Sequence, residues 1–169
     1  MKVCVLSSGS KGNATYIETD NHKILIDVGI TCKELKSRLD NIGVNIMDID
    51  TLLITHSHSD HIKGLASLVK KTNLKVFILE EMLDEIKNKI PYDNINYYTN
   101  PLYIEDVKIE LIRISHDVEG VGFIIESNDR NLVYITDTGY INRKYLPLMK
   151  NKNLYVIESN HDEEMLMEG

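Results

Sequence analysis

Three of the six histidines lie within six consecutive residues. His56, His58 and His61 form, with Asp60, the pattern His-x-His-x-Asp-His directly after the apolar stretch Thr51–Thr55. Because alternate residues of an extended segment point the same way, His56 and His58 can converge on one point. Asp60 and His61, where the next helix begins, can face a second point nearby. Imidazole and carboxylate together suit zinc, manganese or iron rather than calcium.

Two further candidate ligands follow predicted strands farther along the chain. His116 comes after the strand that ends at Ile114, and Asp137 comes after Leu132–Thr136. Binding residues gather on the loops at strand ends. Taken singly, each candidate is as typical of a polar turn, and Asp60 of a helix N-cap. The four motif residues at their spacing, followed by one candidate at each later strand end, favour a metal site.

The composition excludes several classes of protein. The chain has 169 residues, of which 43% are hydrophobic and 27% charged, as in a soluble globular protein. No apolar run approaches the roughly 18 residues of a membrane helix, and the first residues do not resemble a signal peptide. Two cysteines, Cys4 and Cys32, exclude a disulfide scaffold and indicate a cytoplasmic setting. The net charge of −7 argues against purely electrostatic nucleic-acid binding.

Strands and helices alternate along the chain. The predicted strands are Lys2–Leu6, Ala14–Glu18, Lys23–Asp27, Thr51–Thr55, Lys75–Leu79, Ile95–Tyr98, Tyr103–Ile114, Gly120–Glu126, Asn131–Thr136 and Leu154–Glu158. The predicted helices are Thr31–Ile42, His61–Lys71, Glu80–Ile90 and Asn142–Lys150. This mixture favours an α/β (α+β) fold, a two-sheet sandwich with outer helices. No linker, repeat or change of composition divides the chain, so we expect one domain over residues 1–169.

The C-terminal end of this domain is expected to be missing. Residues from His161 onward read as the start of a helix that has no partner. Few predicted helices cover the strands of the second half. Four apolar side chains there would be left in water: Ile112, Ile114, Ile124 and Ile135. We therefore expect a C-terminally truncated fragment of a longer protein.

The histidine motif, with Asp27 upstream and His116 and Asp137 downstream, resembles that of the metallo-β-lactamase superfamily. Three further segments are similar to the WalJ family, also called YycJ or VicX, which resembles ribonucleases Z and J: Ser7–Asn13, Thr136–Tyr140 and Glu158–Asp162. The resemblance covers essentially the whole chain. It implies an αββα sandwich with the site between the sheets at one edge.

The resemblance also implies two divalent metal ions, zinc or manganese. The implied ligands are His56, His58 and His116 for one ion, Asp60 and His61 for the second, and Asp137 as a bridge. Asp27 would orient the histidine loop from behind the ligands, although a strand-ending turn explains it equally well. The superfamily has one more histidine ligand near its C-terminus, and His161 does not match that motif. The last ligand of the second ion is therefore expected to be missing.

Such a centre could cleave a phosphodiester. A hydroxide that bridges the two ions would be the nucleophile, and Asp60 or Asp137 the proton acceptor. We predict His161 as the proton donor to the leaving oxygen. The remaining candidates would orient it or contact phosphate: Asp162, Glu158, Asn160, Ser8, Lys11 and Asn13. Alternatively, the loop Ser7–Asn13 is an ordinary connection between two strands, and His161 is a solvent-exposed side chain without a catalytic role.

The resemblance implies a 5′→3′ exonuclease that acts on duplex DNA, plausibly in repair. DNA is favoured over RNA as the partner, and no membrane is expected. Arg143, Lys144, Lys150 and Lys152 could follow a nucleic-acid backbone, or simply be a solvated surface. Two alternatives stay open because a fold does not fix a substrate. One is another metallo-hydrolase, of thioesters, lactams, cyclic nucleotides or RNA, and the other is a non-catalytic regulatory module. The oligomeric state cannot be read from the sequence.

Overall fold

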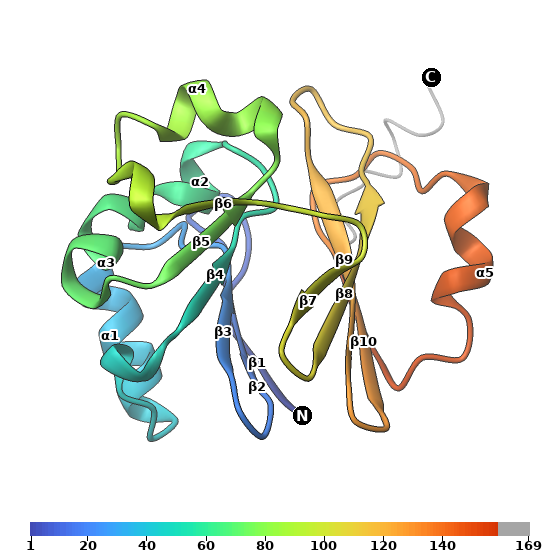
Figure 1. Cartoon of the computed structure of the whole chain (residues 1–169), viewed down its shortest axis with the longest axis horizontal. Coiled ribbons are helices and arrows are strands. Elements are labelled where there is room, and N and C mark those ends of the chain that lie inside the picture. Colours follow the sequence, from blue (N-terminus) through green and yellow to red (C-terminus); the bar gives the residue numbers. More distant parts are fainter. Residues whose placement is uncertain (159–169) are drawn as a thin grey trace.

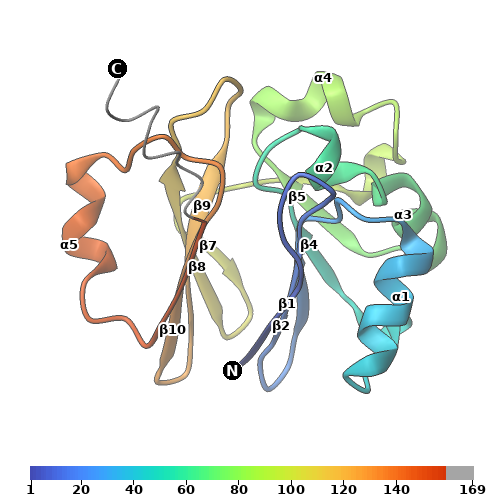
Figure 2. The same cartoon turned by 180° about the vertical axis from the view of Figure 1, so that it is seen from behind.

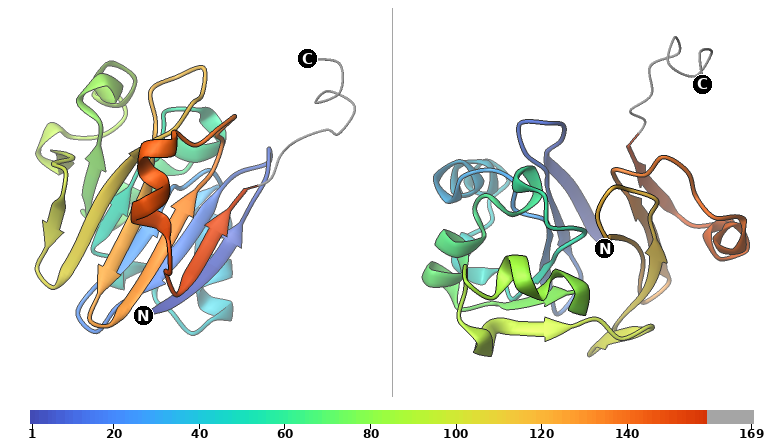
Figure 3. Two further views of the ribbon diagram at one scale, coloured as in Figure 1. Left: turned by 90° about the vertical axis from the view of Figure 1, so that its right-hand side faces the viewer. Right: turned by 90° about the horizontal axis from the view of Figure 1, so that it is seen from above.

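Two β-sheets pack face to face, and helices cover the outer face of each (Figure 1). The computed structural model describes residues 1–158. In these residues the first sheet has six strands in the order β1-β2-β3-β4-β5-β6, and the second has five in the order β11-β10-β9-β8-β7. Seen from above, the two sheets lie between the helices of the first half and α5 (Figure 3). The predicted αββα layering is therefore present.

The first sheet begins antiparallel and continues parallel. Its strands are β1 Lys2–Ser7, β2 Ala14–Glu18, β3 Lys23–Ile26, β4 Thr51–Leu53, β5 Lys75–Ile78 and β6 Ile95–Tyr97. β1, β2 and β3 pair as an antiparallel meander, and β3, β4, β5 and β6 are parallel. Parallel pairs need crossover segments that lie over a sheet face. The helical segments between these strands provide them.

The second sheet is antiparallel except at one edge. Its strands are β7 Leu102–Ile104, β8 Val107–Arg113, β9 Val121–Ser127, β10 Arg130–Ile135 and β11 Leu154–Ile157. β11 pairs parallel with β10 after a crossover through α5. The predicted single strand Tyr103–Ile114 is wrong, because β7 and β8 form a hairpin. The chain reverses at Glu105, which has the positive φ of 49° that such a tight turn requires.

The helices are shorter than the sequence predicts. They are α1 Cys32–Asn41, α2 Ser59–Ile62, α3 Leu65–Thr72, α4 Leu83–Ile86 and α5 Leu146–Met149, with 3₁₀ turns at Ile46–Asp48, Glu80–Met82, Tyr92–Asn94 and Arg143–Tyr145. The N-cap at Thr31 is confirmed, since its hydroxyl accepts a hydrogen bond from the Glu34 amide at 3.2 Å. The predicted helix His61–Lys71 is two helices. Gly64 separates them and donates its amide hydrogen to the Val28 carbonyl at 2.8 Å.

The outer face of the second sheet is covered where the sequence predicts exposure. Ile112, Ile124 and Ile135 are buried in a cluster with Val133 and Met149. Met149 belongs to α5, which lies across this face (Figure 3). α5 follows a 3₁₀ turn and contains a proline, so its sequence has only a short helical periodicity. That pattern is too short to predict which face of the sheet the helix packs on. The prediction that these three isoleucines are exposed to solvent is therefore wrong.

Three backbone segments meet at the upper edge of the first sheet in Figure 1. The Asn13 amide donates to the Asp60 carbonyl at 2.8 Å, and the Gly29 amide donates to the Asn13 carbonyl at 2.7 Å. Figure 2 shows the β1–β2 loop beside α2 as a result. A Cβ atom on Gly29 would lie only 1.5 Å from the Asp60 carbonyl oxygen. Only glycine therefore allows these three segments to touch.

Gly29→Ala should consequently destabilise the fold. The added methyl group meets backbone atoms that belong to two other segments, so it cannot be accommodated by a side-chain rotation. We expect the free energy of unfolding to fall by about 3 kcal/mol, the upper end of the usual cost of overpacking. Urea unfolding followed by circular dichroism measures it. Gly139→Ala is the matched control, because its Cβ would lie 3.7 Å from the nearest atom. Equal stabilities of the two variants would contradict this packing.

Candidate metal centre

A fully buried carboxylate holds the histidine loop in place. Asp27 follows β3, has a positive φ of 59° and is 0% exposed. Its Oδ1 accepts the Thr55 amide hydrogen and its Oδ2 accepts the Thr55 hydroxyl hydrogen, both at 2.8 Å. The same Oδ2 lies 2.8 Å from Nδ1 of His61. Nδ1 is thereby engaged, and Nε2 of His61 faces the side chains of Asp60 and Asp137.

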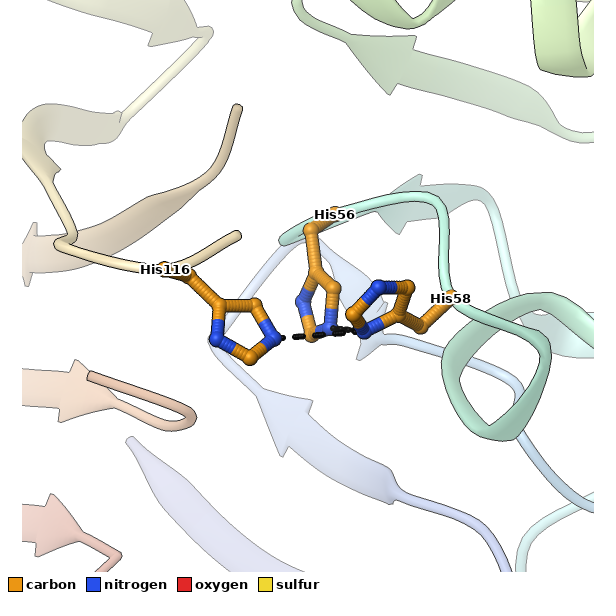
Figure 4. A group of neighbouring side chains, drawn as sticks. All are labelled: His56, His58 and His116. Atoms are coloured by element: carbon orange, nitrogen blue, oxygen red, sulfur yellow. Dashed lines mark hydrogen bonds between the residues drawn. The ribbon is translucent and has the colours of Figure 1, made fainter. Parts of the chain in front are cut away.

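Three imidazole rings converge in front of this carboxylate, as Figure 4 shows for His56, His58 and His116. Nδ1 of His58 lies 3.2 Å from Nε2 of His56 and 3.2 Å from Nε2 of His116. Two nitrogen ligands of a tetrahedral zinc ion, at bonds of about 2.0–2.1 Å, are separated by about 3.3–3.4 Å. These two separations are therefore close to those that one ion requires, and all three rings offer a ligand atom within 4.8 Å of the others.

His116 reaches this group from the other sheet. It lies in the loop between β8 and β9, and the Val121 amide at the start of β9 donates to the Thr55 carbonyl at 2.9 Å. The Ser115 amide donates to the Thr138 hydroxyl at 3.1 Å, and the Gly139 amide to the Ser115 carbonyl at 2.9 Å. Backbone hydrogen bonds thus fix the loops after β4, β8 and β10 to one another.

A second group lies beside the first. Nε2 of His61 is 3.1 Å from Oδ2 of Asp137 and 3.7 Å from Oδ2 of Asp60. Asp137 follows β10 with a positive φ of 49°, and its Oδ2 is buried without a well-directed hydrogen bond within residues 1–158. His56, His61 and Asp137 can offer ligand atoms within 4.8 Å of one another. A buried carboxylate oxygen beside imidazole nitrogen atoms is suited to pair with a cation, either the protonated ring or a metal ion.

The buried charges shift the titration of these groups. Burial, together with the neighbouring His61, lowers the pKa of His56 to about 4. Burial also lowers the pKa of His61, but the carboxylates of Asp27 and Asp137 outweigh it and raise that pKa to about 10. Contact with His61 lowers the pKa of Asp137. The buried carboxylate of Asp27 and the half-buried one of Asp137 thus favour positive charge at His61, which a proton or a metal ion at Nε2 can supply.

The structure therefore brings together the six side chains predicted as metal ligands: His56, His58, His116, His61, Asp60 and Asp137. The set of imidazole nitrogen and carboxylate oxygen fits two divalent ions of the zinc or manganese type. Thr55 is a functional residue that the sequence does not single out. Its hydroxyl contacts Asp27 and lies 3.0 Å from Nδ1 of His56. A threonine at the end of a strand carries no signal of such a role.

The other predicted site residues are placed differently. Asn13 is 3% exposed, and its amide nitrogen lies 2.9 Å from Nε2 of His61, so it faces the metal centre and not the solvent. Ser8 and Lys11 are exposed on the β1–β2 loop. Oε2 of Glu158 accepts the Asp137 amide hydrogen at 3.3 Å. Three predicted residues lie outside the described part of the chain: Asn160, His161 and Asp162.

The chain is similar in sequence to several known proteins. A model of the metallo-beta-lactamase superfamily matches residues 8–146. The exodeoxyribonucleases YycJ of Bacillus anthracis and WalJ of Streptococcus pneumoniae are 37% and 33% identical to the chain, over 98% and 99% of it. The chain spans 65% of the length of each of these relatives.

A solved structure carries the same fold. The short form of human tRNase Z superposes with a TM-score of 0.78 at 16% identity, covering 99% of this chain and 82% of that one. The predicted sandwich fold is confirmed. Within residues 1–158, no helix combines the length and apolar character needed to cross a membrane.

Removal of the Asp27 carboxylate should lower the free energy of unfolding more than removal of a solvent-accessible carboxylate does. Asp27→Ala leaves the Thr55 amide, the Thr55 hydroxyl and His61 without their buried acceptor. We expect the free energy of unfolding of the metal-free chain to fall by about 3–5 kcal/mol. Urea titration measures this loss. Asp60→Ala, whose side chain is 29% exposed, should cost about 1 kcal/mol or less. A loss below about 1 kcal/mol for Asp27→Ala would contradict the assigned role.

Metal binding at pH 8 should displace a proton from His61. The pKa of about 10 keeps this ring protonated in the metal-free chain, whereas His56, with a pKa of about 4, is already neutral. Metal affinity should therefore rise with pH up to about pH 10. Calorimetry of zinc binding in buffers of different ionisation enthalpy counts the protons. Asp27→Asn lowers the pKa of His61 and should release about one proton fewer. Equal proton release from both chains would refute this assignment.

Proposed function

The chain belongs to the metallo-beta-lactamase superfamily, and we propose on that premise that it is a metal-dependent phosphodiesterase, a 5′→3′ exonuclease acting on duplex DNA. The observation that carries the proposal is the convergence of four histidines and two aspartates from both sheets on one edge. Similarity to two exodeoxyribonucleases over nearly the whole chain supports the choice of DNA. The remote likeness to tRNase Z supports the fold alone.

Each group of ligands would hold one ion. His56, His58 and His116 would bind the first, and His61 and Asp60 the second, with Asp137 between them. When bound, such ions lower the pKa of water and neutralise the charge of a phosphodiester. The role of the chain is to fix these ligands before substrate arrives, through Asp27 and Thr55 behind the histidines.

Asp60 is the better placed of the two candidate proton acceptors. Contact with His61 lowers the pKa of Asp137, which makes that carboxylate a weak base. Asp60 is 3.7 Å from Nε2 of His61 and its side chain is 29% exposed, so Oδ2 can reach a water molecule at the open edge. We therefore assign Asp60 as the group that takes up the proton of the attacking water. The proposed donor to the leaving oxygen, His161, lies outside the described residues.

Two adjoining hollows lead away from His116. The first, of about 300 Å³, is lined by His116, Arg113, Tyr140, Lys144 and Tyr145, among others. The second, of about 610 Å³, shares Arg113 and Tyr145 with the first and continues to Tyr97 and Tyr98. We call the two hollows together the groove. Tyrosine rings, Lys144 and Arg113 line it beside the carboxylates of Glu80 and Glu81, and Arg113 is paired with Glu81. Aromatic rings and cationic side chains suit the bases and phosphates of a nucleic-acid strand. This groove supports a polymeric substrate over a small thioester or lactam.

The direct test is degradation of a 5′-phosphorylated DNA duplex with added manganese or zinc. We expect mononucleotides to leave from the 5′ end, and end-labelled products report this polarity. Asp60→Ala should reduce the rate by at least about 10²-fold, the usual contribution of a positioned base. Asp93→Ala, an exposed aspartate away from the histidine loop, should be unaffected.

Three outcomes would overturn the exonuclease proposal. One is a metal-loaded chain that leaves the duplex intact, and another is equal activity of the wild type and Asp60→Ala. The third is cleavage of a thioester, cyclic nucleotide or RNA in parallel assays while DNA is spared, which would favour another hydrolase of the superfamily. An intact metal centre without any hydrolysis would favour a regulatory module.

The groove predicts a separate effect on substrate binding. Tyr140 is 65% exposed at its wall, and Tyr140→Ala removes a surface on which a base can stack. We expect duplex binding to weaken by about 5- to 100-fold, which corresponds to about 1–3 kcal/mol per stacked base. Fluorescence anisotropy with a labelled duplex measures it. Tyr103→Ala is the matched control, because Tyr103 is 64% exposed on strand β7 and lines neither of the two hollows. If both substitutions weakened duplex binding equally, the groove would not be the DNA-binding surface.

A further inference from the structure

A second group of metal-binding side chains lies at the end of the sandwich opposite the histidine loop. His22 is in the turn between β2 and β3, and Glu105 and Asp106 are in the turn between β7 and β8. Figure 1 shows both turns at the lower end of the two sheets. Their ligand atoms lie within 4.8 Å of one another. We call His22, Glu105 and Asp106 the inter-sheet cluster.

The ring of His22 is held in one orientation. Its Nδ1 lies 3.3 Å from Oδ1 of Asp50. Asp50 is itself fixed, because Oδ2 accepts the Lys23 amide hydrogen and Oδ1 accepts the Thr51 hydroxyl hydrogen, each at 2.7 Å. The backbone amide of His22 donates to the Thr19 hydroxyl at 3.0 Å. A histidine whose one nitrogen faces a carboxylate presents the other as a metal ligand.

The other nitrogen of the ring faces the two remaining members of the cluster. Nε2 of His22 is buried and makes no hydrogen bond within residues 1–158. It lies 3.5 Å from Oε2 of Glu105 and 3.9 Å from Oδ1 of Asp106. Hydrogen bonds from N–H to O are about 2.7–3.2 Å long, so neither contact is one. Two ligands of a tetrahedral zinc ion are about 3.3–3.4 Å apart, which the distance to Glu105 approaches, whereas that to Asp106 is longer.

The charge around Nε2 also favours a cation. Three carboxylates, those of Asp50, Glu105 and Asp106, surround one imidazole whose side chain is 11% exposed. The Asn21 amide donates to Oδ1 of Asp106 at 3.1 Å and lowers the pKa of that carboxyl group. Lys75 borders the same hollow but forms no ion pair with the cluster in the described part of the chain. Excess negative charge beside a buried nitrogen is the environment of a divalent ion.

We propose that His22, Glu105 and Asp106 bind one divalent transition-metal ion, for which zinc has the best-matched ligands, with Asp50 as the positioning residue behind His22. The donors come from both sheets, so the ion fastens the sheets together at the end remote from the histidine loop. This site is independent of the proposed nuclease activity, since none of its residues belongs to the candidate metal centre. Its role is structural, like that of ions that join two otherwise separate hairpins.

Zinc stoichiometry tests the proposal on the full chain. The protein is stripped with a chelator and dialysed against buffered zinc, and bound metal is measured by elemental analysis. We expect the double variant Glu105→Gln/Asp106→Asn to hold one zinc ion fewer than the wild type. Asp129→Asn, an exposed change in the β9–β10 turn, should hold the same number as the wild type. Equal stoichiometry of all three chains would overturn the proposal. Circular dichroism verifies that the variants are folded.

The nitrogen resonances of His22 give a readout that does not depend on counting ions. Zinc binding should shift Nε2 of His22 in the wild type, while Nδ1 keeps its proton toward Asp50. The double variant should show no such shift. Zinc should also raise the melting temperature of the wild type more than that of the double variant. The proposal would be overturned if both ring nitrogens of His22 carried protons and their resonances did not shift with zinc. His22 would then be an imidazolium ion paired with the carboxylates.

Discussion

The buried carboxylate of Asp27 is the constraint on which the candidate metal centre depends. It is fully enclosed and holds the Thr55 amide, the Thr55 hydroxyl and His61 at once. A carboxylate in such a place is tolerated when it is hydrogen-bonded and paired, as these three contacts provide. That requirement fixes the direction in which the loop after β4 leaves the sheet. The same contacts leave Nε2 of His61 and the ring of His56 facing Asp137 on the loop of the second sheet.

The second sheet contributes the remaining ligands of the candidate metal centre. His116 and Asp137 sit on loops of β8 and β10, and a backbone hydrogen bond from Val121 to Thr55 ties those loops to the histidine motif. Both Asp27 and Asp137 adopt a positive φ, a conformation that non-glycine residues retain where the surroundings enforce it. The ligands are thus positioned by the packing of the sheets and by main-chain contacts.

Much of this could be predicted from the sequence, because strand ends carry the ligands and the His-x-His-x-Asp-His spacing is local. The sandwich and the convergence of His56, His58 and His116 follow from that. Other features could not be predicted, because they depend on contacts between distant segments. The burial of Asn13 against His61, the role of Thr55 and the cover of Ile112 by α5 arise only when segments distant in the sequence pack together. The hairpin within residues 103–114 is hidden by a turn without glycine or proline.

The central claim is that side chains of both sheets form one metal centre at the edge beside Asp27. Anomalous diffraction at the zinc absorption edge, on crystals of the zinc-loaded chain, tests it most directly. The account predicts one peak among the nitrogen atoms of His56, His58 and His116 and a second between His61 and Asp137. Crystals that contain zinc but show no anomalous peak at either position would contradict it.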